Sequence, residues 1–131
     1  MILVDASVWI DYLRGTSTPQ AEWLDGHLGA ELLGLTDLTL CEVLQGVPPP
    51  KVKRVQERLL ALDVLPTGGT ELALATASNY RSLRLKGITV RKTIDCWIAT
   101  FCLREGHRLL HHDRDFDPFE SHLGLSVVHP S

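Results

Sequence analysis

The first fifteen residues, MILVDASVWIDYLRG (residues 1–15), contain the pattern that decides the fold. The apolar run before Asp5 is short and has no polar face, so it predicts a strand that is buried on both sides. The residues after Asp5 have helical spacing, with Trp9 and Leu13 on one side, and Gly15 predicts the end of the helix. A buried strand followed at once by a helix is typical of a parallel sheet covered by helices.

The same alternation continues along the chain. Further strands are predicted at residues 31–35, 63–67, 107–111 and 125–129. Helices are predicted at residues 20–29, 36–46, 51–62, 68–87 and 93–106, with Thr36 and Thr93 as N-caps. We therefore predict a single domain over residues 1–131, with an α/β fold. The expected architecture is a three-layer α/β/α sandwich whose parallel sheet has about five strands.

The composition is that of a globular protein, since 44% of the 131 residues are hydrophobic and 22% are charged. No apolar run reaches the roughly 18 residues that a membrane span needs, so no membrane association is expected. No basic region precedes the first apolar run, as it would in a signal peptide. Cys41, Cys96 and Cys102 have no CxxC spacing, and we expect them to be reduced core residues of a cytoplasmic protein.

The net charge of −3 is unevenly distributed. Residues 51–92 contain nine Lys or Arg and three Asp or Glu, a net charge of +6. The rest of the chain has four basic and thirteen acidic residues, a net charge of −9. This division indicates either an acidic pocket beside a basic surface or, more simply, a set of solvated helix faces.

Four acidic residues occupy the same kind of position in the predicted elements. They end a strand, follow one, or lie near the start of the next helix: Asp5, Glu42, Asp95 and Asp113. Strand ends and helix starts share one edge of an open parallel sheet, so these carboxylates should converge there. Asp5 as a helix cap and Asp95 as a partner of the helix dipole are structural alternatives. Glu42 is enclosed by apolar neighbours, and the set predicts a hard divalent cation, Mg²⁺ or Mn²⁺.

The stretch LLHHDRDFD (residues 109–117) brings more acids to that edge. Asp115 is a second candidate ligand beside Asp113, whereas Asp117 is interpreted as a solvated acid. Phe116 should anchor the loop to the core, and Pro118 should end it.

The histidines and Ser7 have simpler interpretations than zinc or nucleophilic chemistry. His111 and His112 are adjacent and lack the spacing of a zinc site. No GxSxG turn surrounds Ser7, which is therefore expected to be a hydroxyl at a helix start that orients a carboxylate or a bound water.

Four stretches together resemble the PIN-domain ribonucleases and, more closely, the VapC toxins of bacterial toxin–antitoxin pairs. They are MILVDASVWIDYLRG, TDLTLCEVLQG, TIDCWIATFCLREG and LLHHDRDFDPF, and the resemblance spans nearly the whole chain. It implies a metal-dependent endoribonuclease that blocks translation or growth, with Asp5, Glu42, Asp95 and Asp113 as its acidic set. It also implies a homodimer and a small antitoxin that blocks the site. Many of those toxins have Thr or Asn where this chain has His111 and His112, so the contact expected there is altered.

The resemblance implies separate roles for the acidic and the basic residues. One or two Mg²⁺ ions held by Asp5, Asp95 and Asp113 would activate a water, while Glu42 would complete a second metal site or orient that water. Phosphates of single-stranded RNA are expected to contact the basic residues Arg81, Arg84, Lys86, Arg91 and Lys92. The apolar side chains of VWIDYL and EWLDGHL predict a dimer contact in the first half of the chain, with the antitoxin docking over the same half.

Two other classes of protein are less well matched. A receiver-type signalling domain would need adjacent acids after the first strand and a Lys after the last, and neither is present. A Mg²⁺-dependent phosphatase would favour a DxD pair after the first strand, where VDAS has one acid. Only the family resemblance favours RNA over DNA as the substrate.

Overall fold

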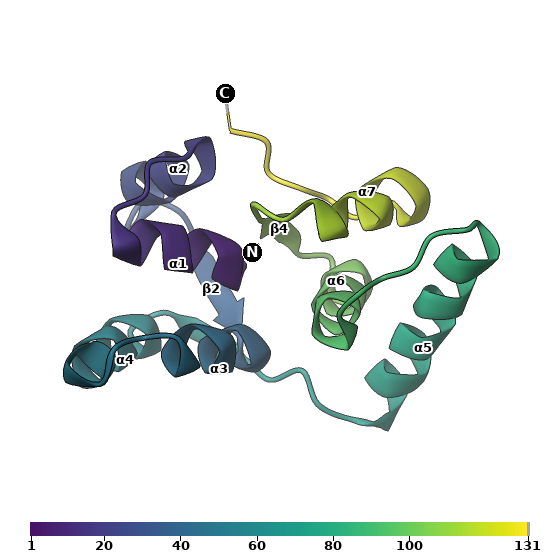
Figure 1. Ribbon diagram of the computed structural model, residues 1–131, viewed down its shortest axis with the longest axis horizontal. Coiled ribbons are helices and arrows are strands. Elements are labelled where there is room, and N and C mark those ends of the chain that lie inside the picture. Colours follow the sequence, from purple (N-terminus) through teal and green to yellow (C-terminus); the bar gives the residue numbers. More distant parts are fainter. Residues whose placement is uncertain (131) are drawn as a thin grey trace.

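The computed structural model describes residues 1–130 and has the predicted three layers (Figure 1). Within these residues, four parallel strands form one sheet in the order β3-β2-β1-β4. The strands are β1 (Ile2–Val4), β2 (Leu33–Thr36), β3 (Asp63–Leu65) and β4 (Arg108–Leu110). The helices are α1 (Ala6–Arg14), α2 (Pro19–His27), α3 (Asp37–Gln45), α4 (Val52–Leu60), α5 (Thr70–Leu85), α6 (Thr93–Glu105) and α7 (Asp117–Leu123).

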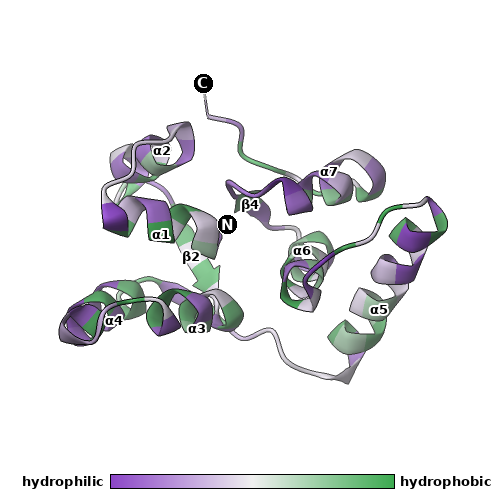
Figure 2. Ribbon diagram, viewed as in Figure 1, coloured by the Kyte–Doolittle hydropathy of each residue, from purple (hydrophilic) through white to green (hydrophobic). Residues whose placement is uncertain are grey.

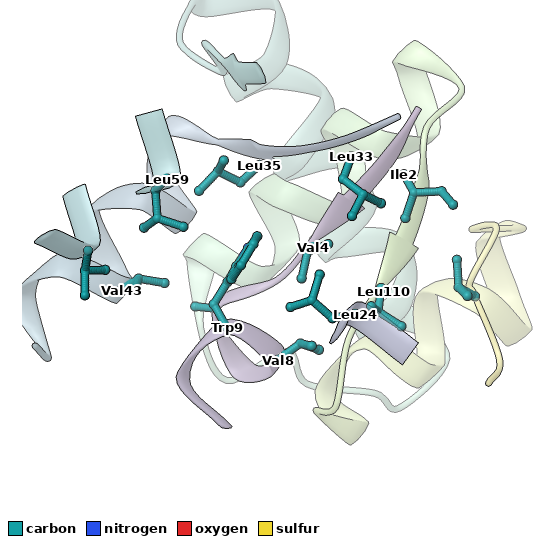
Figure 3. Close-up of a cluster of buried hydrophobic side chains, with 13 residues drawn as sticks. Ile2, Val4, Val8, Trp9, Leu24, Leu33, Leu35, Val43, Leu59 and Leu110 are labelled. Carbon is teal, nitrogen blue, oxygen red and sulfur yellow. The ribbon is translucent and has the colours of Figure 1, made fainter. Parts of the chain in front are cut away.

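The first four helices cover one face of the sheet. Alternate residues of β1 point to opposite faces, and Ile2 and Val4 pack with Trp9 of α1 and Leu24 of α2 (Figure 3). Val43 of α3 joins the same cluster, together with Val55 and Leu59 of α4. Figure 2 shows β2 in green among these helices, which matches its fully buried residues.

The other three helices cover the opposite face. Leu3 of β1 and Leu109 of β4 pack there against α6, whose residues Ile98, Ala99 and Cys102 are fully buried. Phe116 is completely buried in this cluster, so the predicted anchor of the loop after β4 is confirmed. Both faces of the sheet are therefore sealed, and ligands can reach only its edges.

Several predicted details differ from the structure. The fifth strand is reduced to one bridge between Val127 and Leu109. Thr93 is the first residue of α6 rather than its N-cap, which is Lys92 and makes no side-chain capping bond. Pro118 lies where the loop ends, in the first turn of α7, a helix that was not predicted; its fixed φ suits a helix start. Cys41 is exposed, whereas Cys96 and Cys102 are buried free thiols.

The apolar side chains assigned to a dimer contact are divided between the core and the surface. Val8, Trp9 and Leu24 are buried, whereas the others are only partly buried, namely Ile10, Tyr12, Leu13, Trp23 and Leu28. Trp9 is 3% exposed and Leu24 is fully buried. The exposed large apolar side chains lie elsewhere, at Leu32, Leu60, Leu74, Tyr80 and Leu85. None of the helices in residues 1–130 is both long and apolar enough to cross a membrane.

Candidate active site

The strand order opens a crevice between β1 and β4. From β1 the chain moves outward to β2 and β3, and it then returns to place β4 on the other side of β1. This reversal is the topological switch point, where open α/β sheets bind their ligands beyond the carboxyl ends of the strands. Asp5 directly follows β1, and His111 to Asp113 directly follow β4. Asp5 and Asp113, two of the predicted acids, therefore border this crevice.

Asp5 is both a helix cap and a buried acid. Its Oδ2 accepts hydrogen bonds from the backbone N–H of Ser7 at 3.0 Å and from the Ser7 hydroxyl at 2.7 Å. The residue is 4% exposed, and its Oδ1 is buried without a hydrogen-bond partner in residues 1–130. Burial raises the pKa of Asp5 despite the bonds from Ser7, which act in the opposite direction. One oxygen of Asp5 thus holds α1 while the other lacks a partner.

Ser7 joins the ends of the two central strands. Its hydroxyl donates to Asp5 and accepts a hydrogen bond at 3.0 Å from the backbone N–H of His112, which follows β4. The hydroxyl thereby orients the Asp5 carboxylate and fixes the distance between the two sides of the crevice. Thr36, in contrast, caps α3 by accepting from the backbone N–H of Thr39, and its side-chain bonds stay within that cap.

Glu42 is the half-buried acid of α3. The Thr36 cap starts α3 at the end of β2, and Glu42 follows in its second turn. Its Oε1 is buried and unpaired among the described residues. Burial raises the pKa of Glu42, and the charges of Asp5 and Asp113 raise it further, whereas Lys92 lowers it. These charge effects show that Glu42 lies within electrostatic reach of the acids that follow β1 and β4.

Asp95 is a buried acid whose pKa is strongly raised. It lies in the first turn of α6 and is 4% exposed, and its Oδ2 lacks a partner in the part of the chain that the structure describes. Burial, followed by the charges of Asp5 and Asp113, raises its pKa to about 7. Lys92 lowers the pKa of Asp95, but less than these effects raise it. Asp95 is therefore held at the centre of a set of like charges.

Asp113 and Asp115 complete the acidic group. Oxygen atoms of Asp95, Asp113 and Asp115 lie within 4.8 Å of one another. Asp113 also accepts a hydrogen bond at 2.9 Å from the backbone N–H of Asp115, which caps a short 3₁₀ turn. Asp115 forms a bidentate ion pair with Arg91, so a basic residue does lie among these acids. Asp117 is exposed on α7, as expected for a solvated acid.

The donor set suits a hard divalent cation. Three buried carboxylate oxygens from three different elements lack partners within residues 1–130, and they belong to Asp5, Glu42 and Asp95. Leaving such oxygens unpaired is costly unless a cation or a proton satisfies them. All the donors are oxygens, which favours Mg²⁺ or Mn²⁺ over softer metals. Asp95 belongs both to these unpaired acids and to the group with Asp113 and Asp115, so it is the natural centre of a metal site.

Two histidines shape the site in ways that sequence reasoning did not predict. Nδ1 of His111 accepts from the backbone N–H of Asp113 at 3.1 Å, and its ring packs on Phe116. Burial lowers the pKa of His111, so the ring is neutral and carries its proton on Nε2. The ring of His112 lies 3.3 Å from an oxygen of Asp11 on α1. No spacing rule connects residues 11 and 112, so the sequence carried no signal for this pair.

A second unpredicted set of contacts holds the loop after β3 beside the site. Asp37 in the first turn of α3 accepts from the hydroxyl of Thr67 at 2.6 Å and from its backbone N–H at 3.3 Å. The carbonyl of Thr67 accepts from the indole N–H of Trp97 at 2.6 Å. The starts of α3 and α6, which carry Glu42 and Asp95, are thus linked through one buried threonine.

The predicted RNA-binding residues divide into two groups. Arg91 and Lys92 reach the acids, the first through its ion pair with Asp115 and the second through its charge effect on Asp95. Arg81, Arg84 and Lys86 are exposed on α5 or at its end and form no ion pair with these acids in the described structure. Arg84 instead donates to the Thr89 hydroxyl at 3.0 Å.

Comparisons with known proteins agree with this geometry. A family model described as the PIN domain matches residues 2–120, so the chain belongs to the PIN-domain family. Two curated relatives place it among the VapC ribonucleases: "VapC ribonuclease Mb1587" of Mycobacterium bovis and "Ribonuclease VapC11" of Mycobacterium tuberculosis. Each is 34% identical to this chain over 122 residues, which cover 89% of this chain and 90% of the relative.

Solved structures show the same fold at lower identity. FitAcB from Neisseria gonorrhoeae has a TM-score of 0.76 and 22% identity, covering 99% of this chain and 98% of its own. VapBC-1 from nontypeable Haemophilus influenzae has a TM-score of 0.73 and 21% identity, covering 98% and 97%. The three-layer fold is therefore that of this structural group.

Proposed function

We propose that this protein is a Mg²⁺- or Mn²⁺-dependent endoribonuclease and the toxin of a toxin–antitoxin pair. The observation that carries the proposal is the set of unpaired buried carboxylate oxygens on Asp5, Glu42 and Asp95, whose negative charges act on one another. The names of the VapC relatives support RNA as the substrate. Two solved structures with this fold, a toxin–antitoxin complex from Klebsiella pneumoniae and VapBC-5, of a family of toxin–antitoxin systems, from Mycobacterium tuberculosis, support an antitoxin partner.

The acids have distinct parts in the proposed reaction, the hydrolysis of an RNA phosphodiester bond. Asp95, Asp113 and Asp115 would hold the cation as a close group. Asp5 lies outside that group and would add a further oxygen, with Ser7 fixing its orientation. The cation would lower the pKa of a water and offset the charge of the phosphate. Glu42 is half-buried and its pKa is raised, so it is suited to accept the proton of the attacking water.

The direct test is RNA cleavage by the purified protein. Total RNA is incubated with the protein and either Mg²⁺ or a chelator, and the new 5′ ends are mapped. We expect discrete new ends with Mg²⁺ and none with the chelator. A parallel incubation with single-stranded DNA tests the alternative that the protein is a DNA nuclease. Cleavage in the chelator, or of DNA alone, would contradict the proposal.

A groove between α1, α3 and α4 fits the antitoxin. It has a volume of about 540 Å³ and an apolar floor that includes Ile10, Leu13 and Val55. Its rim is basic and exposed, with Arg14, Lys51, Arg54 and Arg58, and none of the residues lining it is acidic. An amphipathic helix with acidic residues beside its apolar stripe is complementary to such a surface. We assign this groove to a helix of the antitoxin, in the first half of the chain as the sequence predicts.

Charge reversal in the groove should weaken the antitoxin complex. For Arg54→Glu/Arg58→Glu, we expect at least about a tenfold loss of affinity for the cognate antitoxin, because attraction becomes repulsion. Calorimetry would measure the affinity, and Arg104→Glu on α6 is the control for altered net charge. An unchanged affinity would exclude this site. If the affinity is unchanged but the variant becomes a monomer, the groove is instead a contact between copies.

The homodimer stays a prediction. The exposed apolar residues on α5, Leu74, Tyr80 and Leu85, offer a second candidate contact surface beside the partly buried side chains of α1 and α2. Light scattering at micromolar concentration measures the oligomeric state directly.

A further inference from the structure

Arg91 forms an ion pair with one member of the acidic group, Asp115. Its Nε lies 3.2 Å from Oδ2 of Asp115, and its Nη2 lies 3.1 Å and 3.0 Å from the two oxygens of the same carboxylate. The Asp115 side chain is only 14% exposed, whereas that of Arg91 is 68% exposed. The guanidinium therefore approaches a nearly buried carboxylate from the solvent side and uses one edge of its fork.

This ion pair competes with a divalent cation for the same carboxylate. The Asp115 oxygens lie within 4.8 Å of oxygens of Asp95 and Asp113, so a cation shared by the three acids would lie close to the guanidinium. Two positive groups that share one carboxylate repel each other and divide its lone pairs. Without a divalent cation, in contrast, the guanidinium offsets one charge in a cluster of repelling acids.

We propose that Arg91 is an exchangeable internal cation: it neutralises Asp115 when the metal site is empty, and it moves to an RNA phosphate when a divalent cation binds. The inference rests on the proposed function, because it takes the metal and the RNA from it. Arg91 immediately precedes Lys92 and the start of α6, which carries Asp95, so a released guanidinium stays beside the bound metal. A guanidinium matches a phosphate as well as a carboxylate, with the same bidentate geometry.

The exchange couples metal binding to RNA binding. Because the metal frees Arg91 for the phosphate, metal should tighten RNA binding, and by linkage RNA should tighten metal binding by the same factor. A fixed RNA contact would instead act equally with and without metal. A residue that only holds Asp115 in place for the metal would make metal binding weaker when it is removed. The three roles therefore predict different changes in metal affinity and in the metal dependence of RNA affinity when Arg91 is replaced.

Calorimetric titration of Arg91→Gln with Mn²⁺ tests the first half of the exchange. We expect the variant to bind Mn²⁺ about tenfold more tightly than the wild type, because the competing cation is gone. Arg91→Lys should lie between the two, since it keeps the charge but loses the fork. Arg104→Gln is the matched control. Arg104 lies in the last turn of α6, far from the acids, and pairs with Glu71 at 4.0 Å. Weaker or unchanged Mn²⁺ binding by Arg91→Gln would overturn the proposal.

RNA binding tests the second half. A single-stranded RNA oligonucleotide is titrated in the Glu42→Gln background, which prevents cleavage, with Mn²⁺ or with chelator. With Mn²⁺, adding Arg91→Gln should weaken binding about tenfold and lower the slope of log affinity against log salt by about 0.7. In chelator the same substitution should have little effect, because Arg91 is already held by Asp115. An equal loss under both conditions would overturn the exchange and leave a fixed phosphate contact. Wild-type protein that binds neither Mn²⁺ nor RNA would instead refute the proposed function itself.

Discussion

Glu42→Gln should lower the rate of RNA cleavage by about 10²- to 10⁴-fold, the range typical of losing a general base. The amide has nearly the same shape as the carboxylate, but it cannot accept a proton at neutral pH. Because Asp95, Asp113 and Asp115 form a close group without Glu42, the variant should still bind Mn²⁺. It should also keep its affinity for RNA, since the basic residues are untouched. Single-turnover cleavage measures the rate, and calorimetry measures both affinities.

A second glutamate provides the control. Glu105→Gln at the exposed end of α6 makes the same chemical change far from the crevice and should leave cleavage at the wild-type rate. If Glu42→Gln cleaves as fast as this control, Glu42 takes no part in the reaction. If it loses Mn²⁺ binding as well as cleavage, Glu42 is a metal ligand rather than the proton acceptor.

Metal-free protein should become less stable as the pH rises from 5 to 8, and Asp95 should be a main cause. Its pKa is raised from 3.8 to about 7 in the folded protein, so over most of this range the folded state binds more protons than the unfolded state. Stability from such a group is complete below pH 4 and is lost as the pH rises through 7. The pKa values of Asp5 and Glu42 are also raised, and these groups act in the same direction.

The comparison of wild type with Asp95→Asn isolates this effect. In chelator at pH 8, the neutral variant should be more stable than the wild type by roughly 2–3 kcal/mol, a melting-temperature difference on the order of 10 °C. The difference should shrink as the pH falls and should nearly vanish only below about pH 4, where Asp95 is protonated in both the folded and the unfolded protein. The lowered pKa of His111 acts in the opposite direction in both proteins and cancels in the comparison.

With bound metal, the wild type should melt at a higher temperature than Asp95→Asn, the reverse of the order in chelator. Mn²⁺ at pH 8 binds the ionised carboxylates of the folded state, so it should raise the melting temperature of the wild type far more than that of Asp95→Asn. Thermal unfolding followed by circular dichroism measures all these values. If Asp95→Asn has a lower melting temperature than the wild type in chelator at pH 8, Asp95 stabilises the metal-free fold and is not an unpaired metal ligand.

The sequence predicted the convergence of the acids because a parallel sheet gathers its strand ends at one edge, whatever their separation in the chain. It did not predict the partners of those acids. Arg91 reaches Asp115 across 24 residues from a connection without periodicity, and His112 reaches Asp11 across 101. Such pairs depend on how loops are oriented, which neither residue type nor spacing determines. The helix α7 was missed because Pro118 was interpreted as an end, although proline favours the first turn of a helix equally well.

The position of β4 beside β1 has a consequence during synthesis. The first strand to leave the ribosome must wait for residues 108–110 before it gains its second neighbour. Asp113, its partner Asp115 and the backbone contact with Ser7 all come later still. A nascent chain that ends before β4 therefore has Asp5, Glu42 and Asp95 without Asp113 and Asp115. A chain with such distant pairing completes its sheet late, so we expect the acidic group to form only after residues 108–115 have been synthesised.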